Sequence, residues 1–133
     1  MNPRLLLDTH ILLRWIADSR RLSRDQMRLM NQAERRQELF AISEITLMEL
    51  ALLRVNPGRL SSQIEQAFNA IEVSETIQVL PLTVEIAREI TPLIGLLRDP
   101  ADCVIVATAQ VHGLRLLTSD QRILDSNLTP VVG

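Results

Sequence analysis

Short apolar runs alternate with longer amphipathic segments along this chain of 133 residues, and the alternation restricts the possible folds strongly. Runs that we expect to be strands are 5–7, 39–42, 77–80, 114–117 and 131–132. Expected helices begin at or near Thr9, Ser23 and Ser43 and span 62–73, 83–93, 100–111 and 121–124, with a turn at Asn56-Pro57-Gly58. Uniformly apolar strands between helices are typical of a parallel sheet covered on both faces. The sequence therefore predicts an α/β fold with three layers, α/β/α, a central parallel sheet of four to five strands, and one domain over residues 1–133.

Four acidic residues are attached to segments that must be interior in such a fold. Asp8 directly follows the first strand, Asp120 follows the fourth, Glu49 lies inside 45–53, and Asp102 precedes the apolar run 103–109. Because an ionised carboxylate is costly to remove from water, we expect the four to meet in one crevice beyond the carboxyl ends of the strands. Neighbouring carboxylates repel each other and take up protons unless a cation lies among them. The pattern therefore indicates a metal site.

Helix capping offers a second interpretation for several of these acids. Asp8 could cap the first helix, and Asp120 could cap the last one in competition with Ser119. In the segment 99–102, Asp99 is expected to be the cap before Pro100, while Asp102 would lie in the first turn. Asp102 nevertheless begins the inward-facing side of its helix, so we predict that it is a ligand and that Asp99 has a capping or supporting role.

Glu49 is harder to explain by local structure alone. On a helix it shares a face with apolar residues, namely Ile45, Leu52 and Leu53, so we expect its side chain to point inward. A buried ion pair with an arginine is the structural alternative to a metal ligand.

The basic residues are all arginine: the chain has 14 arginines, no lysine and 16 acids, and its formal net charge is −2. If four acids bind metal, 12 acids remain against 14 arginines, so the rest of the surface is slightly basic. Several arginines crowd one stretch, namely Arg20, Arg21, Arg24, Arg28, Arg35 and Arg36. This stretch has two interpretations, a patch for phosphate contacts or a solvated helix face.

Other features narrow the class of protein. No apolar stretch approaches the ~18 residues that span a membrane, and Asp8 interrupts any N-terminal signal segment, so we expect a cytoplasmic protein. Cys103 is the single cysteine, and no cysteine and histidine spacing suggests zinc. A receiver domain would need a lysine beside its acids, and a phosphatase of the paired-aspartate type would need an acid at residue 10, where His10 stands. No glycine-rich phosphate loop is present.

Four segments in order resemble the motifs of PIN-domain ribonucleases of the VapC toxin type. They are 6–15, which begins Leu6-Leu7-Asp8-Thr9; 43–51, around Glu49; 98–102, followed by 106–109; and 116–120, which ends Thr118-Ser119-Asp120. Together they extend over residues 5 to about 125, nearly the whole chain.

The resemblance implies a PIN-like domain that hydrolyses RNA phosphodiester bonds with Mg²⁺ or Mn²⁺, as the toxin of a toxin–antitoxin pair. On the matching positions Asp8, Glu49, Asp102 and Asp120 would bind the metal, while Asp99, Thr9 and Ser119 would support them or cap helices. It also implies a cognate antitoxin that holds the toxin inactive, and a homodimer. A PIN-fold module that binds RNA without cleaving it is the alternative.

Overall fold

The computed structural model describes residues 2–55, 58 and 60–133. The turn predicted at 56–58 lies outside these residues except for Gly58. The strands are β1 Leu5–Leu7, β2 Phe40–Ser43, β3 Ile77–Leu80, β4 Arg115–Leu117 and β5 Val131–Val132. The helices are α1 Thr9–Ala17, α2 Arg24–Arg35, α3 Glu44–Arg54, α4 Leu60–Val73, α5 Val84–Ile90, α6 Pro100–His112 and α7 Gln121–Ser126, with 3₁₀ turns η1 Ser19–Arg21 and η2 Thr91–Leu93.

The five strands form one parallel sheet in the order β3-β2-β1-β4-β5. The chain builds the sheet outward from β1 to β3 and then returns to place β4 on the other side of β1. The strand order therefore reverses between β1 and β4, and in open parallel sheets a ligand crevice forms at such a reversal, beyond the carboxyl ends of the strands. Asp8 follows β1 directly at this point.

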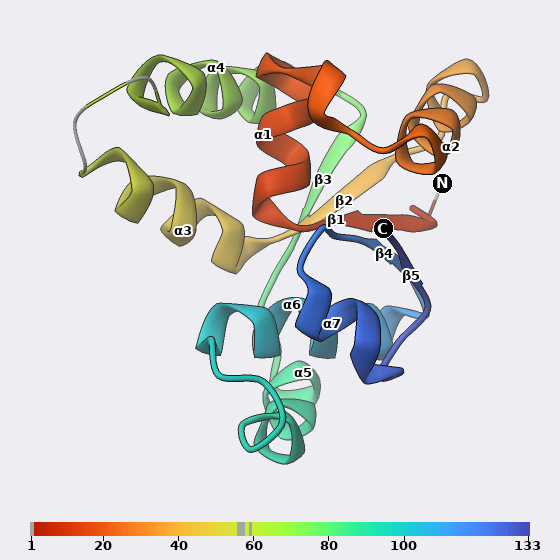
Figure 1. Ribbon diagram of the computed structural model, residues 1–133, viewed down its shortest axis with the longest axis vertical. Helices are drawn as coiled ribbons and strands as arrows, with labels where there is room; N and C mark the ends of the chain where they lie inside the picture. The colour runs from red at the N-terminus through yellow and green to blue at the C-terminus, as the bar shows by residue number, and fades with distance from the viewer. Residues whose placement is uncertain (1, 56–57, 59) are drawn as a thin grey trace.

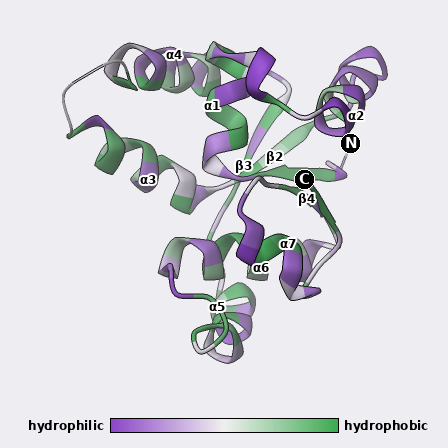
Figure 2. Cartoon of the chain, viewed as in Figure 1, coloured by the Kyte–Doolittle hydropathy of each residue, from purple (hydrophilic) through white to green (hydrophobic). Residues whose placement is uncertain are grey.

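Helices cover both faces of the sheet, which confirms the predicted three-layer architecture. Helices α1, α2 and α4 lie on one face, and α5, α6 and α7 lie on the other (Figure 1). Within β1, Leu5 and Leu7 pack into the first core and Leu6 packs into the second. The central strands β1 and β2 are buried on both faces and are apolar as far as Ser43 at the end of β2, which agrees with the green colour of β2 in Figure 2.

The helix boundaries follow from capping chemistry. Six helices begin after a residue whose side chain accepts a hydrogen bond from the first turn: Asp8, Ser23, Ser43, Thr83, Asp99 and Asp120. The helix predicted over 83–93 is α-helical only to Ile90, because Pro92 cannot donate the hydrogen bond that would continue it. None of the helices within the described residues is long and apolar enough to cross a lipid bilayer.

Candidate active site

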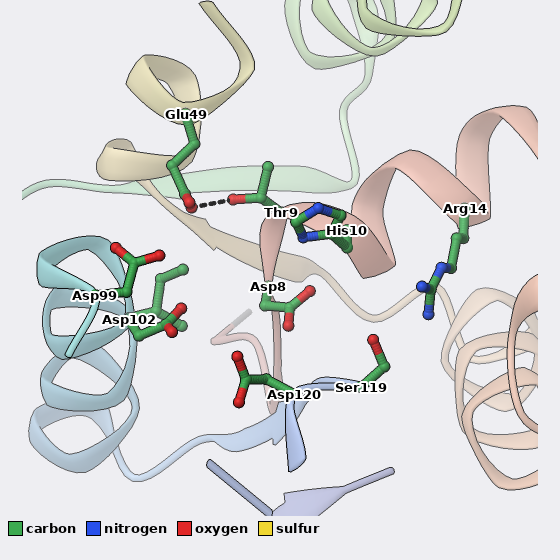
Figure 3. Close-up of a pocket in the computed structure, with 10 residues that line it drawn as sticks. Asp8, Thr9, His10, Arg14, Glu49, Asp99, Asp102, Ser119 and Asp120 are labelled. Carbon is green, nitrogen blue, oxygen red and sulfur yellow. Dashed lines mark hydrogen bonds between the residues drawn. The ribbon is translucent and has the colours of Figure 1, made fainter. Parts of the chain in front are cut away.

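A cavity of about 290 Å³ opens where β1 and β4 end, and acidic side chains surround it (Figure 3). Its lining consists of Asp8, Thr9, His10, Arg14, Glu49, Asp99, Asp102, Ile105, Ser119 and Asp120. All four acids predicted as ligands are in this lining, and so are the three residues predicted to support them or cap helices. The fold thus brings together groups that lie up to 112 residues apart in the sequence, from Asp8 to Asp120.

Asp8 is the most firmly held of the acids. It is only 7% exposed, and its Oδ1 accepts a hydrogen bond of 2.9 Å from the backbone N–H of Ile11, which caps α1. Its Oδ2 accepts a hydrogen bond of 2.5 Å from the hydroxyl of Thr118. Burial raises the pKa of Asp8, and these two hydrogen bonds act in the opposite direction. Asp8 therefore caps α1 and lines the cavity at the same time.

Asp120 is fixed in a similar way at the end of the neighbouring strand. Its backbone N–H donates to the Thr118 hydroxyl at 3.1 Å, and its Oδ1 accepts from the N–H groups of Arg122 and Ile123 at 2.9 and 3.3 Å. Asp120, rather than Ser119, is therefore the cap of α7. Its carboxylate lies beside those of Asp8 and Asp102 in Figure 3.

Glu49 reaches the cavity from the middle of α3 and is half-buried. The Thr9 hydroxyl donates to its Oε1 at 2.5 Å and also lies 3.1 Å from the Thr46 hydroxyl. Burial raises the pKa of Glu49, and repulsion from Asp99 and Asp8 adds to this effect. The predicted inward face of this helix was wrong at Leu52, which is 60% exposed. The buried residues of α3 are Thr46 and Leu50, so Glu49 lies at the border of the core and the cavity.

Asp102 is an acid of the cavity whose charge no hydrogen bond from the described residues offsets. It lies in the first turn of α6, is half-buried, and its carboxylate accepts no hydrogen bond from any described residue. Its pKa is raised to about 7, chiefly by burial and then by repulsion from the other acids, in the order Asp99, Asp120, Glu49 and Asp8. A carboxylate in this setting is stabilised by a nearby cation.

Asp99 is the cap that the sequence predicted. Its carboxylate accepts a hydrogen bond of 2.9 Å from the N–H of Ala101, and Pro100 follows as the first residue of α6. Asp99 is exposed and also lines the cavity. Its negative charge repels that of Asp102 and so helps to raise the pKa of Asp102.

Sequence reasoning missed three residues of this site. Thr118 is fully buried and joins the two strand ends by bonding both Asp8 and Asp120. His10 and Arg14 lie on the cavity wall, and their charges lower the pKa of Asp8. The signal for Arg14 was its place four residues after His10, on the same side of α1. A polar residue at the end of an apolar strand was the signal for Thr118.

The arginine-rich stretch takes no part in this cavity. Three of its arginines form exposed ion pairs with nearby acids, Arg20 with Asp18, Arg28 with Asp25 and Arg36 with Glu38. For these three the solvated-face interpretation is the better one, because exposed pairs of this kind contribute little free energy and neutralise the charge locally.

The donor set suits a hard divalent cation. Mg²⁺ and Mn²⁺ prefer carboxylate and water oxygens, and the cavity offers several carboxylates without nitrogen or sulfur competitors other than His10. Within the described residues no three such side chains are already arranged as a metal-binding cluster. A cation bound among carboxylates would offset their mutual repulsion and let them approach one another.

The fold and the site define the class of this protein: the chain belongs to the PIN domain family, which matches residues 5–126. Ribonuclease VapC22 of Mycobacterium tuberculosis is 33% identical to it over 120 residues, which are 90% of this chain and 88% of that protein. Among solved structures, a DNA-bound VapBC complex from Salmonella typhimurium aligns with a TM-score of 0.73 at 19% identity, covering 98% of each chain. VapBC2 from Rickettsia felis, bound to a DNA fragment from its promoter, aligns with a TM-score of 0.72 at 15% identity, covering 96% of each.

Proposed function

We propose that this protein is a metal-dependent endoribonuclease that hydrolyses RNA phosphodiester bonds with Mg²⁺ or Mn²⁺. The observation that carries the proposal is that Asp8, Glu49, Asp102 and Asp120 line one cavity at the ends of β1 and β4. When these carboxylates are ionised, their mutual repulsion destabilises the folded protein unless a cation lies among them. The name of the similar VapC22 protein supports RNA as the substrate.

In this proposal Asp8 and Asp102 hold the principal ion. The two hydrogen bonds to Asp8 fix its carboxylate in place, while Asp102 has no competing partner among the described residues. A bound divalent ion would supply Lewis acidity, which lowers the pKa of a water and neutralises charge on a phosphate. No nucleophilic side chain is required.

Glu49 and Asp120 complete the site or orient the attacking water. The Thr9 hydroxyl occupies Oε1 of Glu49, which leaves Oε2 to accept a proton from that water. The backbone hydrogen bonds of α7 occupy Oδ1 of Asp120, which leaves its Oδ2 for a ligand or a water. Arg14, on the cavity wall, would contact the substrate phosphate.

The biological role follows from similarity to toxin–antitoxin complexes. We infer that the chain is the toxin of such a pair, that it acts in the cytoplasm as a homodimer, and that a cognate antitoxin holds it inactive. The similarity to solved VapBC structures, one of them described as a member of a family of toxin–antitoxin systems, supports an antitoxin partner. Exposed apolar side chains on α3, such as Met48 at 52% and Leu52 at 60%, are the kind of surface that a protein partner covers.

The test is cleavage of total cellular RNA by purified, antitoxin-free protein with Mg²⁺, Mn²⁺ or EDTA. We expect discrete fragments with either metal, none in EDTA, and a loss of at least a hundredfold in the Asp8→Asn and Asp102→Asn variants. Asp25→Asn is the matched control, because Asp25 is an exposed acid on α2 that pairs with Arg28 outside the cavity.

Two outcomes would contradict the proposal. Cleavage that persists in EDTA or in the Asp8→Asn variant would exclude this metal site. Retained RNA binding without cleavage by metal-loaded protein would favour the non-catalytic RNA-binding module instead. An antitoxin gene directly upstream, whose product blocks cleavage, would support the toxin role.

A further inference from the structure

The acidic cavity adjoins a second hollow of about 310 Å³ whose lining also includes arginines. This second hollow shares three acids with the cavity, Asp99, Asp102 and Asp120, and adds Arg98 and Arg122. A third hollow of about 380 Å³ adjoins it at Arg122 and is lined otherwise by Leu96, Asp125, Ser126 and Leu128. Because neighbouring hollows share residues, together they form one groove that leads from acids to arginines and then to an apolar end.

Each of the two arginines lies close in the sequence to an acid of the cavity. Arg98 immediately precedes Asp99, the cap of α6, and the backbone N–H of Arg122 donates to Asp120 in the cap of α7. Both side chains are exposed, and within residues 2–55, 58 and 60–133 neither forms an ion pair, although three acids line the same hollow. A guanidinium that is not committed to a carboxylate can bind a phosphate through two parallel hydrogen bonds.

The apolar end of the groove has a different character. Leu96 is 60% exposed although it is a large hydrophobic residue, and Leu128 is half-buried beside it. A flat nucleobase can cover such a surface, while its phosphate stays at the arginine end of the same hollow. The groove therefore offers three surfaces in order. The acids would face the scissile phosphodiester, the arginines the phosphate of the adjoining nucleotide, and the apolar end its base.

We propose that this groove is a binding subsite for the RNA nucleotide next to the scissile bond, with Arg98 and Arg122 on its phosphate and Leu96 and Leu128 against its base. The subsite rests on the proposed ribonuclease function, since it places the scissile phosphodiester at the acids. Arg98 and Arg122 then position the RNA through its phosphate, while Leu96 and Leu128 provide the contact to the base. The arginine-rich stretch of η1 and α2 has no part in it.

Binding can be tested separately from cleavage. Fluorescence anisotropy would follow a fluorescein-labelled single-stranded RNA of mixed sequence on Asp102→Asn protein in EDTA, at a series of salt concentrations. Each phosphate contact with single-stranded nucleic acid contributes about 0.7 to the slope of log affinity against log salt. Because the proposal places both arginines on one phosphate, the added Arg98→Gln/Arg122→Gln pair should lower the slope by about 0.7 and weaken binding roughly 5-fold at 0.1 M salt.

Arg88→Gln is the matched control, because Arg88 is an exposed arginine of α5 that lines none of the three hollows. It should leave the slope unchanged. Thermal melting would show that all variants remain folded. The base end is tested by Leu96→Ser, which should weaken binding of the RNA several-fold at an unchanged slope. The same variant should not affect binding of an abasic oligonucleotide of equal length.

The outcomes separate this inference from the proposed function. An unchanged slope in the double arginine variant, with metal-dependent cleavage intact in the wild type, would overturn the subsite and leave the nuclease standing. A reduced slope without any cleavage by the wild type would support the groove as an RNA site and reject the nuclease. Equal effects of Leu96→Ser on RNA and abasic oligonucleotides would overturn the base contact.

Discussion

The hydroxyl of Thr118 donates a hydrogen bond of 2.5 Å to Oδ2 of Asp8, although 110 residues separate them in the sequence. The same hydroxyl accepts the N–H of Asp120, so one buried threonine ties the ends of β1 and β4 together. Both acids of the strand reversal depend on it for their position. Replacing it should therefore affect stability and cleavage together.

Thr118→Val removes the hydroxyl while keeping the size of the side chain. The variant leaves Oδ2 of the buried Asp8 without its donor, so we expect the free energy of unfolding to fall by about 2 kcal/mol, typical for a hydrogen bond to a charged group. Urea denaturation would measure the loss, and RNA cleavage should fall at least tenfold. Thr118→Ser keeps the donor and is the control. A valine variant with wild-type stability and activity would show that this bond is unimportant.

Gln26 supports Thr118 from the opposite side. This buried residue of α2 donates from Nε2 to the carbonyl oxygens of Thr118 and Val132, at 3.1 Å each, and its Oε1 completes the capping box with Ser23. We expect Gln26→Met to lower the free energy of unfolding by about 1–3 kcal/mol, because the Thr118 carbonyl loses its donor while the Val132 carbonyl keeps only the backbone N–H of Thr118.

Chemical denaturation of Gln26→Met beside Gln32→Met would check this expectation. Gln32 is a half-buried glutamine of the same helix with no side-chain hydrogen bond among the described residues. An equal fall in the free energy of unfolding in both variants would mean that the hydrogen bonds of Gln26 do not stabilise the fold.

The raised pKa of Asp102 predicts how the metal-free protein responds to pH. Its pKa rises from 3.8 in the unfolded chain to about 7 in the folded one, so the folded state binds this proton more tightly. The resulting stability is complete below about pH 4 and is lost as the pH rises toward 7. Asp102→Asn should therefore melt at nearly the same temperature as wild type at pH 4 and a few degrees higher at pH 8, in EDTA. Partial exposure screens the effect and keeps it small.

Differential scanning calorimetry across pH 4–8 would measure this difference. A wild type as stable as Asp102→Asn at pH 8 without metal would contradict the electrostatic picture of the cavity. Added salt should reduce the difference, because it screens the repulsion between the carboxylates.

Metal binding should release protons. Because Asp102 titrates near pH 7 and the pKa of Glu49 is also raised, a divalent cation must displace protons from the cavity below that pH. Calorimetric titration with Mn²⁺ in buffers of different ionisation enthalpy should show proton release at pH 6.5 that disappears by pH 8.5. The affinity should rise over the same interval. Asp102→Asn should release fewer protons, and equal release would argue against Asp102 as a ligand.

Much of the fold could be predicted from the sequence. The strand at 77–80 has the predicted bounds, the caps at Ser23 and Asp99 begin helices as predicted, and the capping alternative considered for Asp8 is observed as well. These features are local, because a cap or an apolar run is set by residues within a few positions of each other. The face of α3 was mispredicted at Leu52, since which side of a helix is covered depends on the elements packed against it.

Of the site, the sequence by itself determined the acids and their places at the ends of strands and on the interior helices. Only the tertiary structure decided that β4 lies beside β1, which puts Asp120 and the Thr118 hydroxyl next to Asp8. It also brought Arg98 and Arg122 into the same groove as the acids. The physical reason is that the order of strands is fixed when apolar faces that are distant in the sequence pack together. The residues near β1 do not determine which strand will pair with it.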